Sequence, residues 1–180
     1  LPFVIRGSVV LVMAAAVLDL FPGTEIGIGP ATDEGFYYDF AFKEPLLPEQ
    51  LPKIEARMRE IVKAASPFIK EEMPRDSAVK LFADAYQPLK LELIADNVTD
   101  DVARVYRTGD FVDLCLGPHV ADTGKLGAFR LLSIPGAYWR GSEKTRILTR
   151  SPATDRPTPT DLRAPPARPD REAAREARRP

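Results

Sequence analysis

The sequence predicts an α+β domain, an antiparallel sheet with a buried N-terminal helix and one or two amphipathic helices packed on it. Three observations predict this fold class. An apolar helical stretch opens the chain, short β-rich runs separated by glycine or proline fill its second half, and helices and strands do not alternate in the βαβ order of a parallel sheet. With 44% apolar residues among 180, the chain can bury one ordinary core.

The first predicted element is a helix over the apolar residues 9–18, which ends at the stop signal Phe21-Pro22-Gly23. Arg6 precedes this run, as a basic residue precedes the apolar part of a signal peptide. The run is too short to span a bilayer, and no pair of small residues follows it as a cleavage site. We therefore expect a core helix and no membrane contact.

The remaining elements follow from periodicity and turn signals. Residues 24–30 and 35–40 are β-rich runs around a turn, which predicts a hairpin. Apolar residues recur at helical spacing through residues 48–65 and predict an amphipathic surface helix. A shorter helix is expected from Asp76 through Phe82, after which residues 89–94 lead into a loop. Further strands are predicted at residues 102–107, 111–116, 128–134 and 146–149.

A change of composition divides the chain into a domain over residues 1–150 and a tail over residues 151–180. The tail is rich in proline and arginine, and Leu162 is its only large aliphatic residue. We expect it to be disordered and to add nothing to the stability of the domain, because it cannot bury enough apolar surface. A basic RNA-binding arm is the alternative, although acidic residues interrupt its arginine clusters and no aromatic residue is present to stack on a base.

Charge and composition exclude several classes of protein. The 25 basic and 26 acidic residues nearly cancel, so any contact with RNA must be local. One cysteine and one histidine cannot form a disulfide or a four-ligand Cys/His zinc site, so we expect no bound metal, no cofactor and a reducing, cytoplasmic setting. The Gly27-x-Gly29 pair lacks a third glycine and precedes Pro30, so it predicts a turn and not a dinucleotide site.

The segment over residues 109–120 carries the side chains best suited to chemistry. Strand alternation places Val112, Leu114 and Leu116 on one face as core residues, and Asp113 and Cys115 on the other. A turn at Gly117-Pro118 can then return His119 to the same region. An acid, a thiol and an imidazole together are the ingredients of acid–base or nucleophilic catalysis. The alternative is that Cys115 is a small buried apolar residue with no chemical role.

Six blocks of sequence, in the same order, resemble the second N-terminal domain of bacterial threonyl-tRNA synthetases, and the related alanyl-tRNA editing domains are more distant. The resemblance covers residues 6–150. The blocks are Leu20-Phe21-Pro22-Gly23-Thr24, Ile26-Gly27-Ile28-Gly29-Pro30-Ala31, Gly35-Phe36-Tyr37-Tyr38-Asp39-Phe40, Gly109-Asp110-Phe111-Val112-Asp113-Leu114-Cys115, Gly117-Pro118-His119-Val120 and Gly136-Ala137-Tyr138-Trp139-Arg140-Gly141.

The resemblance implies an α+β editing module that hydrolyses seryl-tRNA(Thr). Such a module is needed because one missing methyl group gives a synthetase only about 1–3 kcal/mol of discrimination. The resemblance implies that four side chains surround the scissile aminoacyl ester, while Tyr38 and the Gly29 turn shape the pocket. Those four are Lys90, Asp113, Cys115 and His119. The implied partner is the acceptor end of tRNA(Thr).

The sequence departs from the family at its helical His-x-x-x-His pattern, where Gly7 and Leu11 stand at the two histidine positions and Ser8 is kept between them. Leu116 replaces a usual arginine, and Pro135 interrupts another block. The leading hypothesis is an editing-domain fragment with crippled chemistry and no aminoacylation domain. The alternative is a non-catalytic module that binds the tRNA acceptor end or a synthetase catalytic subunit. A third hypothesis is that the two unusual ends are sequence or reading-frame artefacts around an otherwise ordinary domain.

Overall fold

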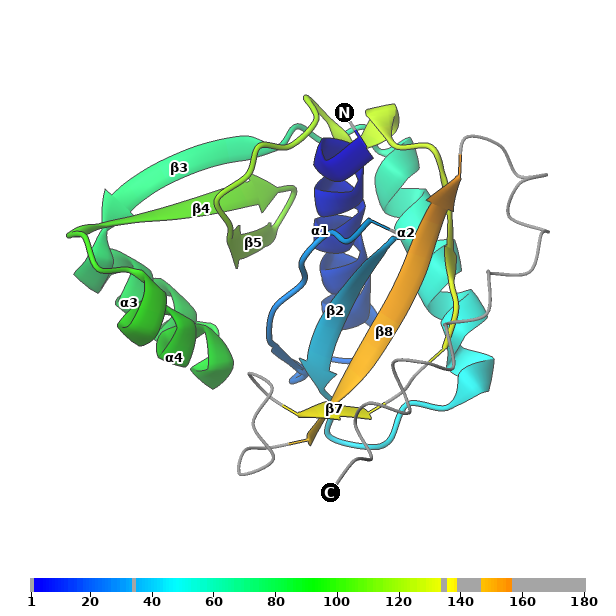
Figure 1. The fold of residues 1–180 in the computed structure, drawn as a ribbon, viewed down its shortest axis with the longest axis horizontal. Helices are drawn as coiled ribbons and strands as arrows, with labels where there is room; N and C mark the ends of the chain where they lie inside the picture. Colours follow the sequence, from blue (N-terminus) through cyan, green and yellow to red (C-terminus); the bar gives the residue numbers. More distant parts are fainter. Residues whose placement is uncertain (1, 34, 134–135, 139–146, 157–180) are drawn as a thin grey trace, which may run out of the picture.

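The computed structural model describes residues 2–33, 35–133, 136–138 and 147–156, and it forms two lobes around the N-terminal helix (Figure 1). The helices and strands in chain order are α1 (Pro2–Leu20), β1 (Glu25–Ile26), β2 (Phe36–Ala41), η1 (Pro48–Gln50), α2 (Leu51–Lys63), β3 (Ile69–Pro74), α3 (Arg75–Asp84), α4 (Pro88–Asn97), β4 (Val102–Thr108), β5 (Phe111–Leu114), η2 (Thr123–Lys125), β6 (Ala128–Leu131), β7 (Gly136–Tyr138) and β8 (Ile147–Arg156).

The larger lobe is an antiparallel sheet in the order β1-β2-β8-β6, with β7 also paired to β8, and α1 and α2 pack on it (Figure 1). Its core combines the buried middle of α1 with the aromatic residues Phe36, Tyr38 and Phe40 of β2 and with Ile54 and Met58 of α2. Helical spacing puts Ile54 and Met58 on one face of α2, which is why that helix packs as the sequence predicts.

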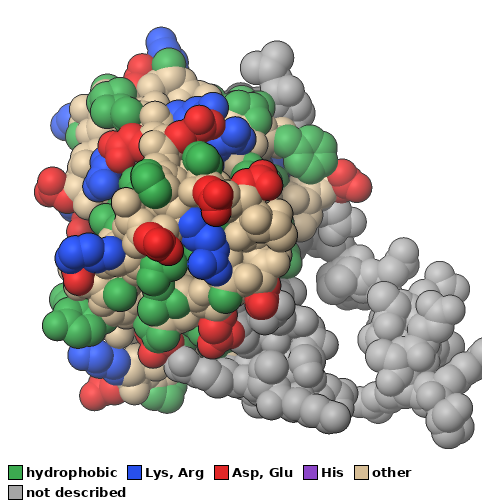
Figure 2. Space-filling view, turned by 90° about the vertical axis from the view of Figure 1, so that its left-hand side faces the viewer, with side chains coloured by type: hydrophobic (Ala, Val, Ile, Leu, Met, Phe, Trp, Pro, Cys, Tyr) green, Lys and Arg blue, Asp and Glu red, His purple; other side chains and the backbone are tan. Residues whose placement is uncertain are grey.

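The smaller lobe is a three-stranded antiparallel sheet in the order β3-β4-β5, covered by α3 and α4. Phe82 and Ile94 from the helices pack against Ala103 and Val105 of β4. Acidic and basic side chains are interspersed on the outer face of this lobe, which Figure 2 shows. That face therefore carries no one-sign electrostatic field of the kind that attracts a polyanion.

The predicted α+β class is confirmed, and so are the buried N-terminal helix, the 24–40 hairpin and the amphipathic helix that becomes α2. Two differences concern the smaller lobe. Residues 89–94, expected to lead into a loop, belong to α4, and residues 69–74, given no element by their pattern, form β3. β3 is an edge strand with mostly exposed side chains, and its part-buried positions, Glu71 and Met73, are not matched by an alternation of apolar and polar residues that a pattern could detect.

The N-terminal helix is longer than residues 9–18, because α1 begins at Pro2. Its 18 residues Phe3–Leu20 are long and apolar enough to cross a membrane by length and composition. The prediction that this helix is too short to span a membrane is therefore wrong. The burial of Val12, Met13 and Ala16 at 0% exposure inside the larger lobe identifies α1 as its core helix.

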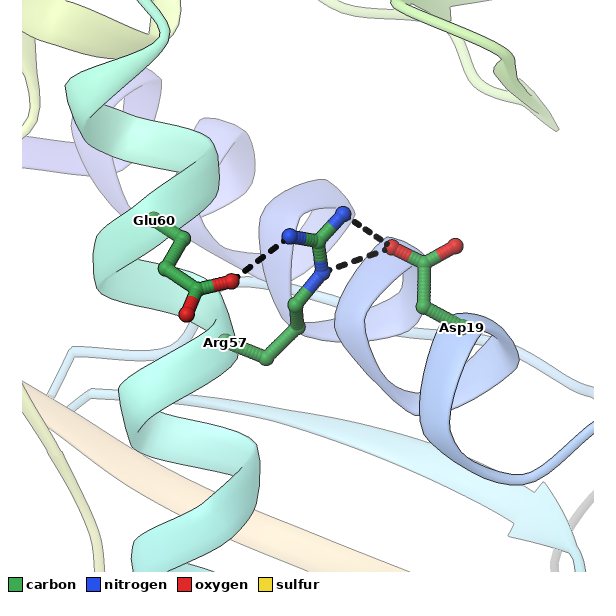
Figure 3. Close-up of polar contacts among 3 residues, drawn as sticks. All are labelled: Asp19, Arg57 and Glu60. Atoms are coloured by element: carbon green, nitrogen blue, oxygen red, sulfur yellow. Dashed lines mark hydrogen bonds and ion pairs between the residues drawn. The ribbon is translucent and has the colours of Figure 1, made fainter.

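A surface ion pair links α1 to α2, since Arg57 of α2 donates to Asp19 of α1 at 2.8 Å (Figure 3). Arg57 also donates to Glu60 of its own helix at 2.7 Å.

The expected boundary after residue 150 falls inside β8, so residues 151–156 are strand and not disordered tail. β8 lies between β2 and β6. Its residue Ala153, for example, pairs with Phe36 of β2 on one side and with Leu131 of β6 on the other. Composition misjudges this stretch because the backbone of neighbouring strands, not the side chains of the stretch itself, supplies its hydrogen bonds. The rest of the predicted tail, residues 157–180, and the predicted motif residues 139–141 lie outside the described residues.

Candidate functional site

A cavity of about 840 Å³ lies between the two lobes, bounded by α1, the turn after β1, α4 and the segment that follows β5. All six residues singled out from the sequence line it. They are Gly29, Tyr38, Lys90, Asp113, Cys115 and His119. Residues far apart in the chain therefore meet at one place, and they form two contacting groups.

The first group is a buried cluster around Asp113. Lys90, in the first turn of α4, forms an ion pair with Asp113 in which Nζ lies 2.5 Å from Oδ1, and both side chains are nearly inaccessible. Tyr38 donates its hydroxyl hydrogen to Asp113 Oδ2 at 2.7 Å. Burial, reinforced by the negative charge of Asp113, raises the pKa of Tyr38 well above its usual value. The phenol therefore stays protonated, and it holds the carboxylate in place opposite Lys90.

The Gly29 turn presses against this cluster. A Cβ atom at Gly29 would overlap the ring of Tyr38 and the side chain of Val10. Glycine is therefore required for the backbone to approach the Tyr38 ring this closely. The turn forms one wall of the cavity.

Gln87, which sequence reasoning did not single out, attaches the start of α4 to the larger lobe. Its Oε1 accepts the backbone N–H of Ile26 at 2.8 Å, and its Nε2 donates to the carbonyl of Thr24 at 3.2 Å. Gln87 is the residue before α4, so these bonds set where the first turn of that helix places Lys90. A buried glutamine beside a proline carries no recognisable motif, and its partners are distant in sequence.

The second group pairs Cys115 with His119. Sγ lies 3.1 Å from Nε2, and the backbone N–H of Gly117 donates to the same sulfur at 3.4 Å. The ring of Tyr106 meets the imidazole edge-on with centroids 4.4 Å apart, and Phe68 stacks on it at 5.4 Å. Burial lowers the pKa of His119 to about 4 and raises the pKa of Cys115 above its usual value. At neutral pH the site therefore holds a neutral imidazole beside a neutral thiol.

Ser8 lies behind this pair on α1. Its Oγ is 3.1 Å from His119 Nδ1, 3.1 Å from the backbone nitrogen of Val120 and 2.7 Å from the carbonyl oxygen of Val4. The serine is fully buried. The sequence signal was its retention between two substituted positions, but only the fold reveals that it contacts the imidazole.

Those two substituted positions, Gly7 and Leu11, also line the cavity. A Cβ atom at Gly7 would make ordinary van der Waals contact with His119 Cε1 at 3.8 Å, so a side chain there would point at the imidazole. Leu11 is 2% exposed and presents an aliphatic wall. His119 is the single histidine of the chain, so this wall of the cavity has no second imidazole.

The expected division of faces in residues 112–116 is wrong in part. Asp113 is the most deeply buried of them, and Leu116, expected in the core, is 78% exposed. The reason is that β5 ends at Leu114, so strand alternation no longer applies at Leu116. Val112 and Leu114 do pack as expected, against the core of the smaller lobe.

The same cavity offers few ligands for a metal ion. Within residues 2–33, 35–133, 136–138 and 147–156, no three side chains from histidine, cysteine, aspartate and glutamate are placed so that they could hold one ion. Asp113 is engaged by Lys90 and Tyr38, and only Cys115 and His119 remain as a nearby pair of soft ligands. The donor set is smaller than the four ligands of a structural zinc site.

Comparison with known proteins gives one consistent answer. The family model for the threonyl and alanyl tRNA synthetase second additional domain matches residues 103–150. Threonine–tRNA ligase of Dehalococcoides mccartyi is 56% identical over 147 residues, which are 82% of this chain and 25% of that protein. The same enzyme of Oleidesulfovibrio alaskensis is 51% identical over 160 residues, covering 89% and 25%. That of Rubrobacter xylanophilus is 47% identical over 177 residues, covering 98% and 27%. The chain thus spans about a quarter of the length of these relatives.

Proposed function

Because the chain belongs to the second additional domain family of threonyl-tRNA synthetases, a family of tRNA-editing domains, we propose that its cavity binds the acceptor end of tRNA(Thr) and hydrolyses the ester of mischarged seryl-tRNA(Thr). The observation that carries this proposal is the meeting of Lys90, Asp113, Cys115 and His119 in one cavity. A cation, a carboxylate, a thiol and an imidazole are groups that ester hydrolysis uses. The setting we expect is the cytoplasm.

In the proposed reaction, water attacks the carbonyl carbon of the ester, the bond to the ribose oxygen breaks, and that oxygen leaves with a proton. In this proposal Lys90 stabilises the negative charge that develops on the carbonyl oxygen, and its support is the ion pair with Asp113, a carboxylate that Tyr38 also binds. Losing one such stabilising group typically costs about 10²–10³ in rate. His119, neutral because burial lowers its pKa to about 4, is the imidazole available to accept a proton from water or from Cys115.

The rate should be low in this chain. The family pattern places two further imidazoles on α1, and here Gly7 and Leu11 line the same wall of the cavity without a titratable group. A site with one imidazole in place of three has fewer groups for general-base catalysis, a contribution that is typically 10²–10⁴-fold. This observation also favours a second candidate function, a non-catalytic module that binds the tRNA acceptor end or docks on a synthetase catalytic subunit.

A single-turnover assay separates the two functions. The chain is mixed in excess with seryl-tRNA(Thr) that carries labelled serine, and both free serine and protein-bound tRNA are measured. Serine release above the spontaneous rate, lost in Lys90→Met and Cys115→Ala, supports the hydrolase. Retention of intact seryl-tRNA(Thr) on the protein supports the binding module. Threonyl-tRNA(Thr) is the matched control, because an editing site should leave it intact.

A further inference from the structure

The contacts of Ser8 determine which of its neighbours must carry hydrogens. A serine hydroxyl has one hydrogen to donate and two lone pairs that accept. Its Oγ touches three polar atoms, the Val4 carbonyl oxygen at 2.7 Å, the Val120 backbone nitrogen at 3.1 Å and His119 Nδ1 at 3.1 Å. The Val4 oxygen can only accept, so the hydroxyl hydrogen goes there, as serines in helices often bond to the preceding turn.

Both lone pairs of Ser8 Oγ are then acceptors. The backbone N–H of Val120 donates to one of them, which leaves the second lone pair facing His119 Nδ1. An unprotonated Nδ1 would place two lone pairs against each other inside the protein, where water cannot relieve the repulsion. The same three contacts therefore allow one assignment only for a neutral imidazole, with the proton on Nδ1.

The other ring nitrogen faces the thiol, since Nε2 lies 3.1 Å from Cys115 Sγ. We propose that Ser8 is a positioning residue that fixes His119 as the Nδ1–H tautomer, so that the free lone pair of Nε2 is directed at the Cys115 thiol. Cys115, His119 and Ser8 then stand in the order of proton donor, base and orienting group. The contacts of the imidazole with Tyr106 and Phe68 hold the ring in the plane that this chain of bonds requires.

This inference deepens the proposed function by naming the atom that accepts the proton in the same site. When Cys115 reacts with an alkylating agent such as iodoacetamide, the new bond forms between Sγ and the carbon of the reagent, iodide departs with its electron pair, and the thiol proton moves to Nε2. The inference concerns the resting protein and can be tested without tRNA, so its failure and the failure of the editing function are distinguishable.

The direct test is nitrogen NMR of the imidazole, which is unambiguous because the chain has a single histidine. Long-range ¹H–¹⁵N correlation on the full ¹⁵N-labelled chain at neutral pH should give a protonated, pyrrole-type signal for Nδ1 and an unprotonated, pyridine-type signal for Nε2. The reverse assignment in the unmodified protein overturns the proposal. This measurement needs no variant, so a variant that fails to fold leaves the test intact.

Variants test whether Ser8 is the residue that sets the tautomer of His119. Ser8→Ala removes the acceptor of Nδ1–H and should shift the tautomer ratio toward Nε2–H about fivefold, the equivalent of one neutral hydrogen bond. Thr123→Ala is the matched control, because Thr123 is also fully buried, donates its hydroxyl to the carbonyl of Ile61 and accepts the N–H of Ser66, yet has no bond to His119. Cys115→Ala should leave the proton on Nδ1. A tautomer that is unchanged in Ser8→Ala, or that changes in Cys115→Ala, overturns the proposal.

Alkylation gives a chemical readout, since Cys115 is the single cysteine. Iodoacetamide forms a thioether with Sγ and releases iodide, and the rate depends on transfer of the thiol proton. Ser8→Ala should react more slowly than Thr123→Ala, by at most about fivefold, because Nε2 would be a free base in a smaller share of molecules. An equal or faster rate in Ser8→Ala overturns the proposal that Nε2 serves the thiol.

Discussion

Lys90 and Asp113 show how strongly a single buried charge depends on its partner. Lys90→Met leaves Asp113 with only the Tyr38 hydroxyl, in a site where both ion-pair side chains are nearly inaccessible. We expect this variant to lose about 3–5 kcal/mol of unfolding free energy, because the carboxylate stays buried without its counter-charge. Urea unfolding measures the loss, and Lys80→Met is the control, since Lys80 forms an exposed pair with Asp84 that contributes little.

The double variant Lys90→Met with Asp113→Asn completes this prediction. It removes the unpaired charge and should recover part of the stability that Lys90→Met alone loses. If the double variant is as unstable as the sum of the two single variants, the two side chains do not interact as the structure has them.

His119 makes the stability depend on pH. Its folded pKa of about 4 lies below the unfolded value of 6.5, because burial disfavours the charged ring. The unfolded chain therefore binds a proton over a pH range in which the folded protein does not, and the unfolding free energy falls as pH drops from 6.5 toward 4. Unfolding curves across this range test the prediction, with His119→Gln as the reference. An identical pH slope in His119→Gln would mean that the imidazole does not contribute.

Gly7 and Leu11 give the most direct prediction about activity. Gly7→His together with Leu11→His places two imidazoles on the cavity wall, one of them where a Cβ atom already has room beside His119. We expect faster release of serine from seryl-tRNA(Thr), at a stability cost of about 1–3 kcal/mol for burying a polar ring at Leu11. The pairing of Gly7→Ala with Leu11→Ala is the matched control. A folded double histidine variant that binds the tRNA but releases serine no faster favours the binding module.

Among the helices and strands, α4 is the one whose position determines where Lys90 lies in the cavity. Gln87→Ala removes both side-chain bonds between the start of α4 and the backbone at Thr24 and Ile26. We expect the unfolding free energy to fall by about 1–3 kcal/mol, because a buried backbone N–H and a carbonyl lose their partners. We also expect Lys90 to be held less firmly in its position at the cavity. Gln50→Ala, which removes one exposed bond to the backbone of Leu47, is the control. Equal stability of the two variants in urea would contradict the role of Gln87.

A comparison of α4 with α1 and α2 shows which helices a sequence pattern can predict and which it cannot. The pattern predicts α2 because its apolar residues repeat on one face, and the signal at Phe21-Pro22-Gly23 marks the end of α1. The first apolar residues of α4, Leu89, Leu91 and Leu93, alternate with charged residues at the period of a strand, and the helix packs against both the smaller core and Leu148 of β8. Two packing surfaces on one short helix remove the periodicity on which such a prediction depends.

For the molecule as a whole, the sequence predicts which residues line the candidate site better than it predicts which side chains contact one another there. The segment over residues 109–120 places Asp113, Cys115 and His119 near one another through local geometry. Lys90, Tyr38 and Gly29 were assigned through resemblance alone, since their meeting with Asp113 depends on how the lobes pack. Ser8 and Gln87 act through partners that are distant in sequence, and no local pattern encodes such contacts.

Truncation tests the role of β8 in the whole molecule. A chain that ends at Arg150 lacks the backbone that pairs with Phe36, Tyr37 and Tyr38 of β2 and with β6. We expect its Tm to fall below that of a chain ending at Arg156 by more than about 4 °C, since about 1 kcal/mol shifts Tm by roughly 2–4 °C at this size. Thermal unfolding of the two truncated chains side by side decides this. Equal Tm values would show that residues 151–156 add nothing.

The position of β8 between β2 and β6 also sets the order in which the protein can assemble during translation. β2 leaves the ribosome well before β8, which is its neighbour on the side away from β1 and the last described strand in the chain. Until then β2 presents an open edge of backbone N–H and carbonyl groups, the kind of edge to which strands of other chains add. Nascent chains should thus depend on chaperones, or on α1 and α2 docking early to shield the sheet, and completion of the sheet should be slow because β2 and β8 are far apart in the sequence.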